Sequence, residues 1–338
     1  ASSKGGRDVA GSSCFNDASR WGMNGRVLNA SEGGFVHDGI RREAVKFGLG
    51  GAVFHPQVHN RKLDGTANPN PWSDHPGTSV NYAEINDNAT LYDKLVLVEE
   101  RADESRYEAL AKLSIALVVL SQGMPILHAR MEFLRTKEIP PAILAEHPDL
   151  YDLWRTSDKK RAFSHNTYNR EDAGNALDWS RRAEKDSVVE YTRGLIALRK
   201  AHPLFRLGTA EAVARSLSFL ESASQPAPHP AAGNGAVSAD SAAGMSAESA
   251  SCLAAPPILG WTIDGDAVQD AWKGVCVLVN PAEIPQIVAL PSSFKGGPWR
   301  LVCDETGVLK GDSGARAGAE GGRPVTVPKK ALYLYAEF

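Results

Sequence analysis

The sequence predicts an α/β region followed by an all-β region. Two observations predict the first region: a strand that runs into polar residues and a helix start in 79–95, and apolar residues at helical spacing in 99–120 and 188–201. A third observation predicts the second region. After Leu207, short apolar or alternating runs are separated by turn residues, as in antiparallel sheets. With 338 residues, the chain is long enough for two hydrophobic cores.

Composition and charge exclude several classes of partner. The formal net charge of −3 indicates neither nucleic acid nor an anionic membrane as a partner. No run of 18 apolar residues occurs, so no transmembrane helix is predicted. The first ten residues lack both an initiator Met and the layout of a secretory signal, so we expect an interior piece of a longer chain. The four cysteines lack CxxC spacing, which predicts reduced thiols. No cofactor is predicted, and the sequence does not indicate whether the protein depends on calcium.

The stretch around Asp87 has the arrangement of a functional loop. Val80 and Tyr82 suit a buried strand, because branched and aromatic side chains pack well on a pleated surface. Asn86, Asp87 and Asn88 follow where the strand gives way to a helix, and the mouth of an α/β structure is a usual location for chemistry. The alternative is a plain turn with a helix cap, because Asn and Asp favour those roles as well.

A second polar segment, 166–179, combines amide and carboxylate side chains with two aromatic faces. It contains Tyr168, Asn169 and Asp172. Sugar hydroxyls need hydrogen-bond donors and acceptors, and sugar rings stack on aromatic side chains, so this composition suits a glucan. A loop of Asx turns that satisfies its own backbone is the alternative.

The remainder of the first region reads as a long loop and one more strand. Residues 31–78 are rich in Gly, Asn and Pro, which predicts a loop with one short helix near 41–47. Its histidines lack zinc-ligand spacing and are expected to be solvated: His37, His55, His59 and His75. An apolar run with a proline near its start predicts a buried strand at 124–129.

Two long segments resemble one enzyme family. Residues 80–95, VNYAEINDNATLYDKL, resemble the segment with the third acidic residue of type I pullulanases and plant-type limit dextrinases in the α-amylase superfamily, roughly V-N-Y-x-x-x-H-D-N-x-T-L-x-D-x-L. This chain departs at Asn86, where the family has histidine. Residues 121–137, SQGMPILHARMEFLRTK, resemble the family's S-Q-G-x-P-F-x-H-A-G-x-E-F-x-R-T-K. Here Arg130 stands where the family has glycine, and an arginine needs room that a glycine does not.

Three shorter segments resemble the same family. Residues 15–25 are similar to F-N-D-x-x-R-D-A-x-R-G, which follows the sixth barrel strand, although Trp21, Gly22 and Asn24 do not match. Residues 166–179 are similar to N-S-Y-N-x-x-D-x-x-N-x-x-D-W, and GLIALRKAHPLFR is similar to the last barrel helix. The resemblance covers roughly residues 12–205 and extends to the tail only through its β-character.

The resemblance implies a fold and its division into domains. Residues 1–205 would be the C-terminal part of a (β/α)8 barrel, strands 6–8, and residues 206–338 a small antiparallel β-sandwich. Within the second part, about 222–257 is dominated by Ala, Ser, Gly and Pro. Such a segment has too little large apolar surface to offset the entropy of ordering, so a disordered insertion is predicted there.

The resemblance also implies a function, the hydrolysis of α-1,6 links in pullulan, limit dextrin or amylopectin. Asp87 stands at the position of the acid that stabilises the transition state. Sugar-binding roles would fall to the polar residues beside it and in the second segment: Asn86, Asn88, Tyr168, Asn169 and Asp172. The family's nucleophile and acid/base come from strands four and five, which no segment of this chain matches. We therefore expect the chain to lack the N-terminal half of the barrel and to be inactive on its own.

A second function class stays open at this stage. A non-catalytic α-glucan-binding or regulatory subunit derived from a debranching enzyme would tolerate the absent acids and the departures at Asn86 and Arg130. The coding sequence upstream of Ala1 would discriminate the two. The compartment is unknown; the resemblance makes a plastid one candidate and a soluble intracellular location the other.

Overall fold

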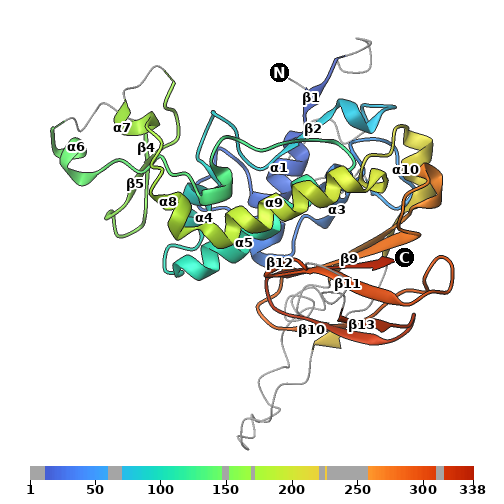
Figure 1. Ribbon diagram of the computed structural model, residues 1–338. Helices are drawn as coiled ribbons and strands as arrows, with labels where there is room; N and C mark the ends of the chain where they lie inside the picture. The colour runs from blue at the N-terminus through green and yellow to red at the C-terminus, as the bar shows by residue number, and fades with distance from the viewer. Residues whose placement is uncertain are drawn as a thin grey trace, which may run out of the picture.

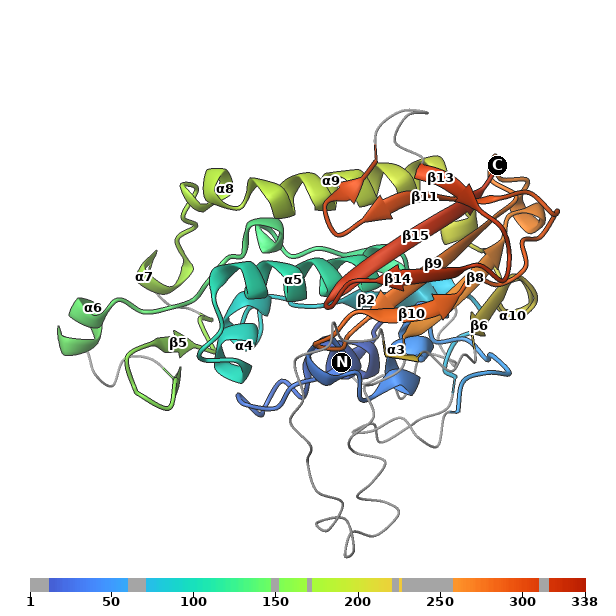
Figure 2. The ribbon, with the colours of Figure 1, turned by 90° about the horizontal axis from the view of Figure 1, so that it is seen from below.

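The protein has a helical layer that lies against a β region, as Figure 1 shows. The computed structural model describes residues 12–59, 71–146, 152–168, 172–220, 225–226, 258–309 and 316–338. Two long helices, α5 and α9, run side by side above the strands in Figure 1, and Figure 2 shows the long strands from below. The bounds are Glu104–Val119 for α5 and Asp186–Ala201 for α9.

A small parallel sheet lies within the helical layer. Its order is β1 (Cys14–Phe15), β2 (Ser79–Tyr82) and β3 (Met124–Ile126), with Val80 paired to Phe15 on one side and Met124 on the other. Because the strands are parallel, the chain leaves all three at the same edge. The helices that connect them are α1 (Asp17–Asn24), α2 (Phe35–Asp38), α3 (Arg42–Leu49), the 3-10 helix η3 (Pro76–Thr78), α4 (Leu91–Val98) and α5.

An extension projects from the end of the layer that carries α8, on the left in Figure 1. It contains the hairpin of β4 and β5, which pair in an antiparallel manner, and short helices around it. Its elements are η4 (Met131–Phe133), α6 (Pro141–Glu146), β4 (Leu153–Arg155), β5 (Ala162–Ser164), α7 (Asp172–Asn175) and α8 (Arg181–Glu184). β4 and β5 have three residues each, too few to show a periodic pattern in the sequence.

The β region is an antiparallel seven-stranded sheet with a second, three-stranded sheet against it. The large sheet has the order β12-β11-β15-β9-β8-β6, with β13 on β11, and the small one β14-β10-β7. Its elements follow the 3-10 helix η5 (Pro203–Phe205): α10 (Ala210–Ser216), β6 (Leu217–Leu220), β7 (Gln225–Pro226), β8 (Leu259–Asp264), η8 (Asp266–Val268), β9 (Gly274–Asn280), β10 (Gln286–Ala289), β11 (Trp299–Asp304), β12 (Gly307–Val308), β13 (Arg316–Ala319), β14 (Pro324–Val327) and β15 (Ala331–Glu337).

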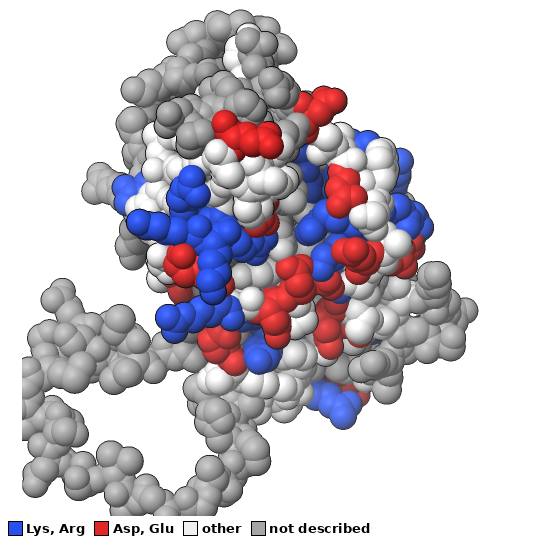
Figure 3. Space-filling view, turned by 90° about the vertical axis from the view of Figure 1, so that its left-hand side faces the viewer, with Lys and Arg blue, Asp and Glu red and all other residues white. Residues whose placement is uncertain are grey.

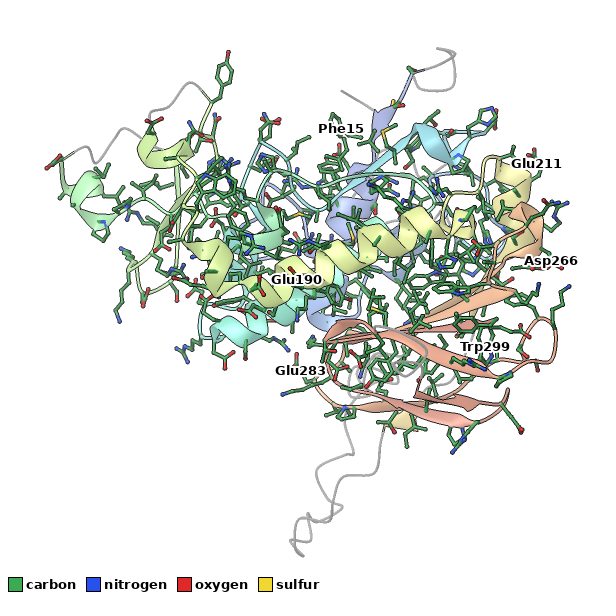
Figure 4. All side chains as sticks on the ribbon, in the orientation of Figure 1. Phe15, Glu190, Glu211, Asp266, Glu283 and Trp299 are labelled. Carbon is green, nitrogen blue, oxygen red and sulfur yellow. The ribbon has the colours of Figure 1, made fainter. Side chains whose placement is uncertain are left out.

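Two hydrophobic cores hold these layers. The larger core lies between the helices α1, α2, α3, α4, α5 and α9 and one face of the large sheet. It includes Trp261 and Val277 of that sheet. The smaller one lies between the two antiparallel sheets and includes Leu278 and Trp299. Val277 and Leu278 are neighbours on β9 and point to opposite faces, as alternation along a strand requires. Figure 4 labels Trp299 within the β region and Phe15 on the far side of the helical layer.

Two predictions about this fold need correction, and a third is untested. The strand predicted at 124–129 ends at Ile126, and Met124 is 42% exposed, so it is not a buried strand. Two histidines of the long loop, His37 and His55, are buried because helices α2 and α3 fold that segment against the core. The insertion predicted at 222–257 lies outside the described residues, apart from β7.

Candidate functional site

Asp87 lies in an exposed loop beyond the carboxyl end of β2. The side-chain amide of Asn86 donates to its Oδ1 over 3.2 Å, and Nη2 of Arg20 donates to its backbone carbonyl over 3.4 Å. Asn88 follows with φ of 64°, a left-handed conformation that Asn tolerates better than most residues. The loop therefore turns sharply and leaves the carboxylate in contact with solvent.

Lys137 lies directly beneath this loop. It is 1% exposed, and its ammonium donates to the carbonyls of Asn86 over 2.7 Å and Asn88 over 2.9 Å. Burial lowers the pKa of Lys137, while Asp93, Glu84 and Asp87 act in the opposite direction. The ammonium thus holds the two carbonyls that flank Asp87, which fixes where that carboxylate stands.

Asp93 connects the start of α4 to the same segment. It is fully buried, and it accepts from the Thr136 hydroxyl over 2.6 Å and from the Lys137 backbone over 2.9 Å. Thr90 caps α4 by accepting from the backbone of Asp93 over 3.1 Å. Burial raises the pKa of Asp93 to about 6, against the effect of these hydrogen bonds. Asp93 therefore has a structural role that ties the Asp87 loop to residues 136–137.

A buried carboxylate that the sequence analysis did not single out lies next to this loop. Glu84 is 1% exposed, and its Oε1 lies 2.8 Å from Nδ1 of His128, while Oε2 accepts from the backbone of Leu91. Arg135 lies 3.2 Å from Nε2 of His128. A neutral imidazole that donates from Nδ1 to Glu84 leaves Nε2 free to accept from Arg135. The sequence signal for Glu84 is an acid between two apolar residues, Ala83 and Ile85, directly after β2.

A narrow positive hollow lies behind the loop. It measures about 10 Å³, room for one water molecule at most, and its lining includes Arg20, Asn88, Lys94 and Trp154. The ammonium of Lys94 donates to the carbonyls of three residues, Arg26, Asn29 and Ala30. Burial lowers the pKa of Lys94 to about 7, and Arg20 and Arg41 lower it further. The hollow is too small for a sugar. The positive charge beside it comes from Arg20 and Lys94.

The second predicted segment is more open. Tyr168 is 85% exposed and Asp172, the first residue of α7, is also exposed, while Asn169 lies outside the described residues. Within the described part, neither Tyr168 nor Asp172 shares a hydrogen bond or an ion pair with Asp87. Asn175 donates to the carbonyl of Thr167 over 3.0 Å, so part of the segment does satisfy its own backbone.

The side chain of Arg130 lies above an aromatic ring. Its guanidinium carbon lies 3.6 Å from the ring centroid of Trp179, and its backbone has φ of 72°. A glycine adopts this conformation without strain, which agrees with the glycine that the resembling family has at this position. The departure at Arg130 is therefore accommodated by a stack with Trp179.

Metal and membrane features are absent from the part of the chain that the structure describes. Among those residues, no three His, Cys, Asp or Glu side chains come together to hold a metal ion. None of the described helices is long and apolar enough to cross a membrane. Cys14, Cys276 and Cys303 are free thiols, and burial raises the pKa of Cys303 to about 12.

Comparisons with known proteins point to one family. No family model matches the chain. A curated pullulanase of Bacillus subtilis is 31% identical over 294 residues, which are 87% of this chain and 31% of that protein. The chain thus spans about a third of the length of this relative.

Solved structures agree with the curated relative. Type I pullulanase of Bacillus subtilis, complexed with maltose, superposes with a TM-score of 0.71 at 24% identity, over 100% of this chain and 37% of that one. Pullulanase of Paenibacillus barengoltzii, in complex with maltohexaose and α-cyclodextrin, gives 0.68 at 26% identity, over 99% and 40%. The chain belongs to the type I pullulanase family, of whose members it matches a C-terminal portion.

Proposed function

We propose that the chain forms part of a glycoside hydrolase that cleaves α-1,6 links of α-glucans, with Asp87 as the carboxylate that stabilises the transition state. The observation that carries the proposal is the exposed Asp87 carboxylate at the carboxyl edge of the parallel strands, with Lys137 holding the carbonyls on either side. Barrel enzymes keep their chemistry at this edge. A carboxylate there is suited to oppose the positive charge that develops on the sugar during glycoside cleavage.

The relatives support the choice of substrate class. They are named pullulanases, and the two solved structures described above hold maltose, or maltohexaose and α-cyclodextrin. We accordingly propose pullulan, limit dextrin or amylopectin as the partner of the complete protein. Asn86, Asn88, Tyr168, Asn169 and Asp172 remain the proposed contacts to sugar hydroxyls and rings.

The finer fold assignment is part of the proposal. We assign β1, β2 and β3 to strands 6–8 of a (β/α)8 barrel, of which residues 1–205 form the C-terminal part. Their parallel order, with helices between them, supports this assignment. We assign residues 206–338 to a β-sandwich, which the core shared between the two antiparallel sheets supports.

We further propose that this chain does not hydrolyse glucan alone. Retaining hydrolysis needs two carboxyl groups about 5 Å apart, a nucleophile and an acid/base, in addition to the stabilising carboxylate proposed at Asp87. Three other acids around the loop are committed elsewhere. Glu84 is bound to His128 and Leu91, Asp93 to Thr136, and Asp17 accepts from the Tyr82 hydroxyl. These three acids are therefore not available as the nucleophile or the acid/base.

Two measurements on the purified chain test the proposal. In calorimetry, maltotetraose is expected to bind the chain, and Asp87→Ala is expected to weaken binding about tenfold, the loss of one charge-assisted hydrogen bond. Asp158→Asn, which removes an exposed carboxylate from the β4–β5 turn, is the matched control and should leave affinity within twofold. Equal affinities of Asp87→Ala and the unmodified chain would refute the role of Asp87. Release of reducing sugar from pullulan would refute the predicted inactivity.

The alternative of a glucan-binding or regulatory subunit is not favoured. The relatives that the chain matches are named as enzymes, and none of the observations on this chain points specifically to a regulatory role.

A further inference from the structure

The turn from Arg130 to Arg135 is strained at both ends. Arg130 and Leu134 have φ of 72° and 59°, and the 3-10 helix η4 lies between them. The backbone of Arg135 closes the turn by donating to the carbonyl of Arg130 over 3.1 Å. A side chain disfavours this conformation, because Cβ approaches the following carbonyl oxygen. Strained residues of this kind concentrate at functional sites, so the turn is a place to look for one.

Arg130 is held flat on the indole of Trp179. Its guanidinium carbon lies 3.6 Å from the ring centroid, and the ring of Phe133 lies 5.7 Å from that of Trp179. Trp179 is nevertheless 61% exposed. Stacking fixes the plane of the guanidinium and leaves its edge, where the N–H donors are, directed away from the ring.

Two arginines at this turn carry donors without partners. Nε of Arg130 and Nη2 of Arg181 are buried and have no hydrogen-bond partner in the structure. Nε of Arg181 donates to the carbonyl of Leu134 over 3.1 Å, which anchors this second guanidinium to the same turn. Neither arginine forms an ion pair with a described residue, and the guanidinium carbon of Arg181 lies 4.8 Å from the ring centroid of Tyr92. Because a buried cationic donor without a partner is costly, such donors indicate a place for a ligand or a water molecule.

The charges around the turn favour an anion. Arg135 contributes a third guanidinium, which contacts the imidazole of His128 and no carboxylate. Glu132 is the one acid inside the turn, and it forms no ion pair with these arginines. Figure 3 shows Lys and Arg side chains gathered on the face of the molecule that carries α8, with acidic side chains between them. Among the described residues, Arg130 and Arg135 form no ion pair with a carboxylate, whereas the charge of Arg181 helps to lower the pKa of Glu104 and of Asp178.

The turn is also next to the Asp87 loop. His128, two residues before Arg130, contacts Glu84, and Lys137, two residues after Arg135, binds the carbonyls on either side of Asp87. A ligand at the turn would therefore lie beside any glucan at Asp87.

We propose that Arg130 on Trp179, together with Arg181, forms an anion site that takes a phosphate monoester carried on a glucose unit. A planar guanidinium binds two phosphate oxygens at once, and an exposed indole offers a face or edge to the attached sugar. The sugar half of this inference rests on the proposed function, whereas the anion half does not. The same contacts accommodate inorganic phosphate, and the titrations below distinguish it from a phosphate carried on glucose.

The test uses calorimetric titrations of the purified chain at constant ionic strength, with three probes: inorganic phosphate, glucose 6-phosphate and glucose. Both phosphate probes are expected to bind and to change the fluorescence of the chain, a change that Trp179→Phe removes. Glucose 6-phosphate is expected to bind more tightly than inorganic phosphate. Arg130→Gly should weaken both by about tenfold or more, because a bidentate charge-assisted contact is lost. Glycine suits the positive φ, so this variant should fold, which thermal melting checks.

A matched control separates a specific site from general charge. Arg193→Gln removes an exposed arginine that pairs with Glu190 on α9, and it should leave phosphate affinity within twofold. The anion site is overturned if phosphate does not bind, if Arg130→Gly binds it as the unmodified chain does, or if Arg193→Gln loses as much. Equal affinity for inorganic phosphate and glucose 6-phosphate overturns the inference that the site recognises the attached sugar. Phosphate binding that persists in a chain that fails to bind maltotetraose would refute the proposed function and leave the anion site standing.

Discussion

The helical layer and the β region hold their backbones together by different means. The parallel strands are two to four residues long, and buried cations supplement their short ladders. Lys94 donates to three carbonyls, Lys137 to two and Arg199 to four. In the β region, β9 and β15 pair over seven residues each. The backbone around Asp87 is therefore fixed by side chains, which single substitutions can remove, and the β region by its own ladder.

The largest expected effect is the loss of a buried cation. Arg199 is 9% exposed, and its guanidinium joins the end of α5, the start of β3 and η5 by donating to the carbonyls of Val119, Ser121, Gly123 and Phe205. Arg199→Met leaves these carbonyls unpaired, so the free energy of unfolding should fall by about 4 kcal/mol in urea denaturation. Arg206→Met, which removes an exposed arginine nearby, should cost less than about 0.5 kcal/mol. Equal costs for the two variants would contradict the comparison.

The next effect concerns pH and a histidine where the two regions meet. His37 is 8% exposed, and its backbone carbonyl accepts from the ammonium of Lys330 in the β region. Burial is the main cause that lowers the pKa of His37, to about 4 from its usual 6.5. Below pH 6.5 the unfolded chain binds a proton that the folded chain does not. The free energy of unfolding should therefore fall by about 3 kcal/mol as the pH drops from 6.5 to 4.

Substitution isolates the contribution of His37. His37→Gln should remove most of this fall, and His59→Gln, at an exposed histidine, should leave it unchanged. Denaturation curves at pH 7, 5.5 and 4 provide the measurement. His55 is also buried with a lowered pKa, so a smaller fall should persist in the His37 variant. The same pH dependence in both variants would show that His37 is not buried in its neutral form.

The smallest expected effect comes from a cluster of ion pairs between the two regions, called the clamp here, which consists of Arg106, Glu99 and Glu283. Arg106 of α5 forms two hydrogen bonds with Glu99 and two with Glu283 of the β region. Figure 4 labels Glu283 where the β region meets the helical layer. Because Glu283 is 61% exposed, solvent screens the pair, and a double-mutant cycle of Arg106→Met and Glu283→Gln should give a coupling of about 1 kcal/mol. This coupling should shrink at 1 M salt; a coupling of zero at low salt would show that the clamp does not join the regions.

The sequence predicted the long elements well. The helix predicted at 188–201 is α9, which begins at Asp186, and the short runs noted after Leu207 include β9. The helix has apolar side chains at helical spacing, and β9 is a continuous apolar run that is buried throughout, so local pattern and burial agree. The hairpin of β4 and β5 and strand β6 escaped prediction, because segments of three or four residues carry no period.

The site was predictable only in part. Asp87 was found through its polar neighbours and the family resemblance, and the structure puts its loop at the strand edge. Glu84, Lys94 and His37 were not predicted to be buried, because burial of a charged or polar side chain depends on carbonyls and partners far away in the sequence. Lys137 was noted within a motif, but its contact with the Asp87 loop spans 51 residues.

The most direct test of the account is a map of where an α-glucan binds. Amide chemical shifts of the isotopically labelled chain, recorded during a titration with maltotetraose, report on each residue. We predict shifts in residues 86–88 and 128–137, little change along β9 and β15, and loss of the shifts in Asp87→Ala. Shifts confined to the β region, or unchanged in that variant, would contradict the account.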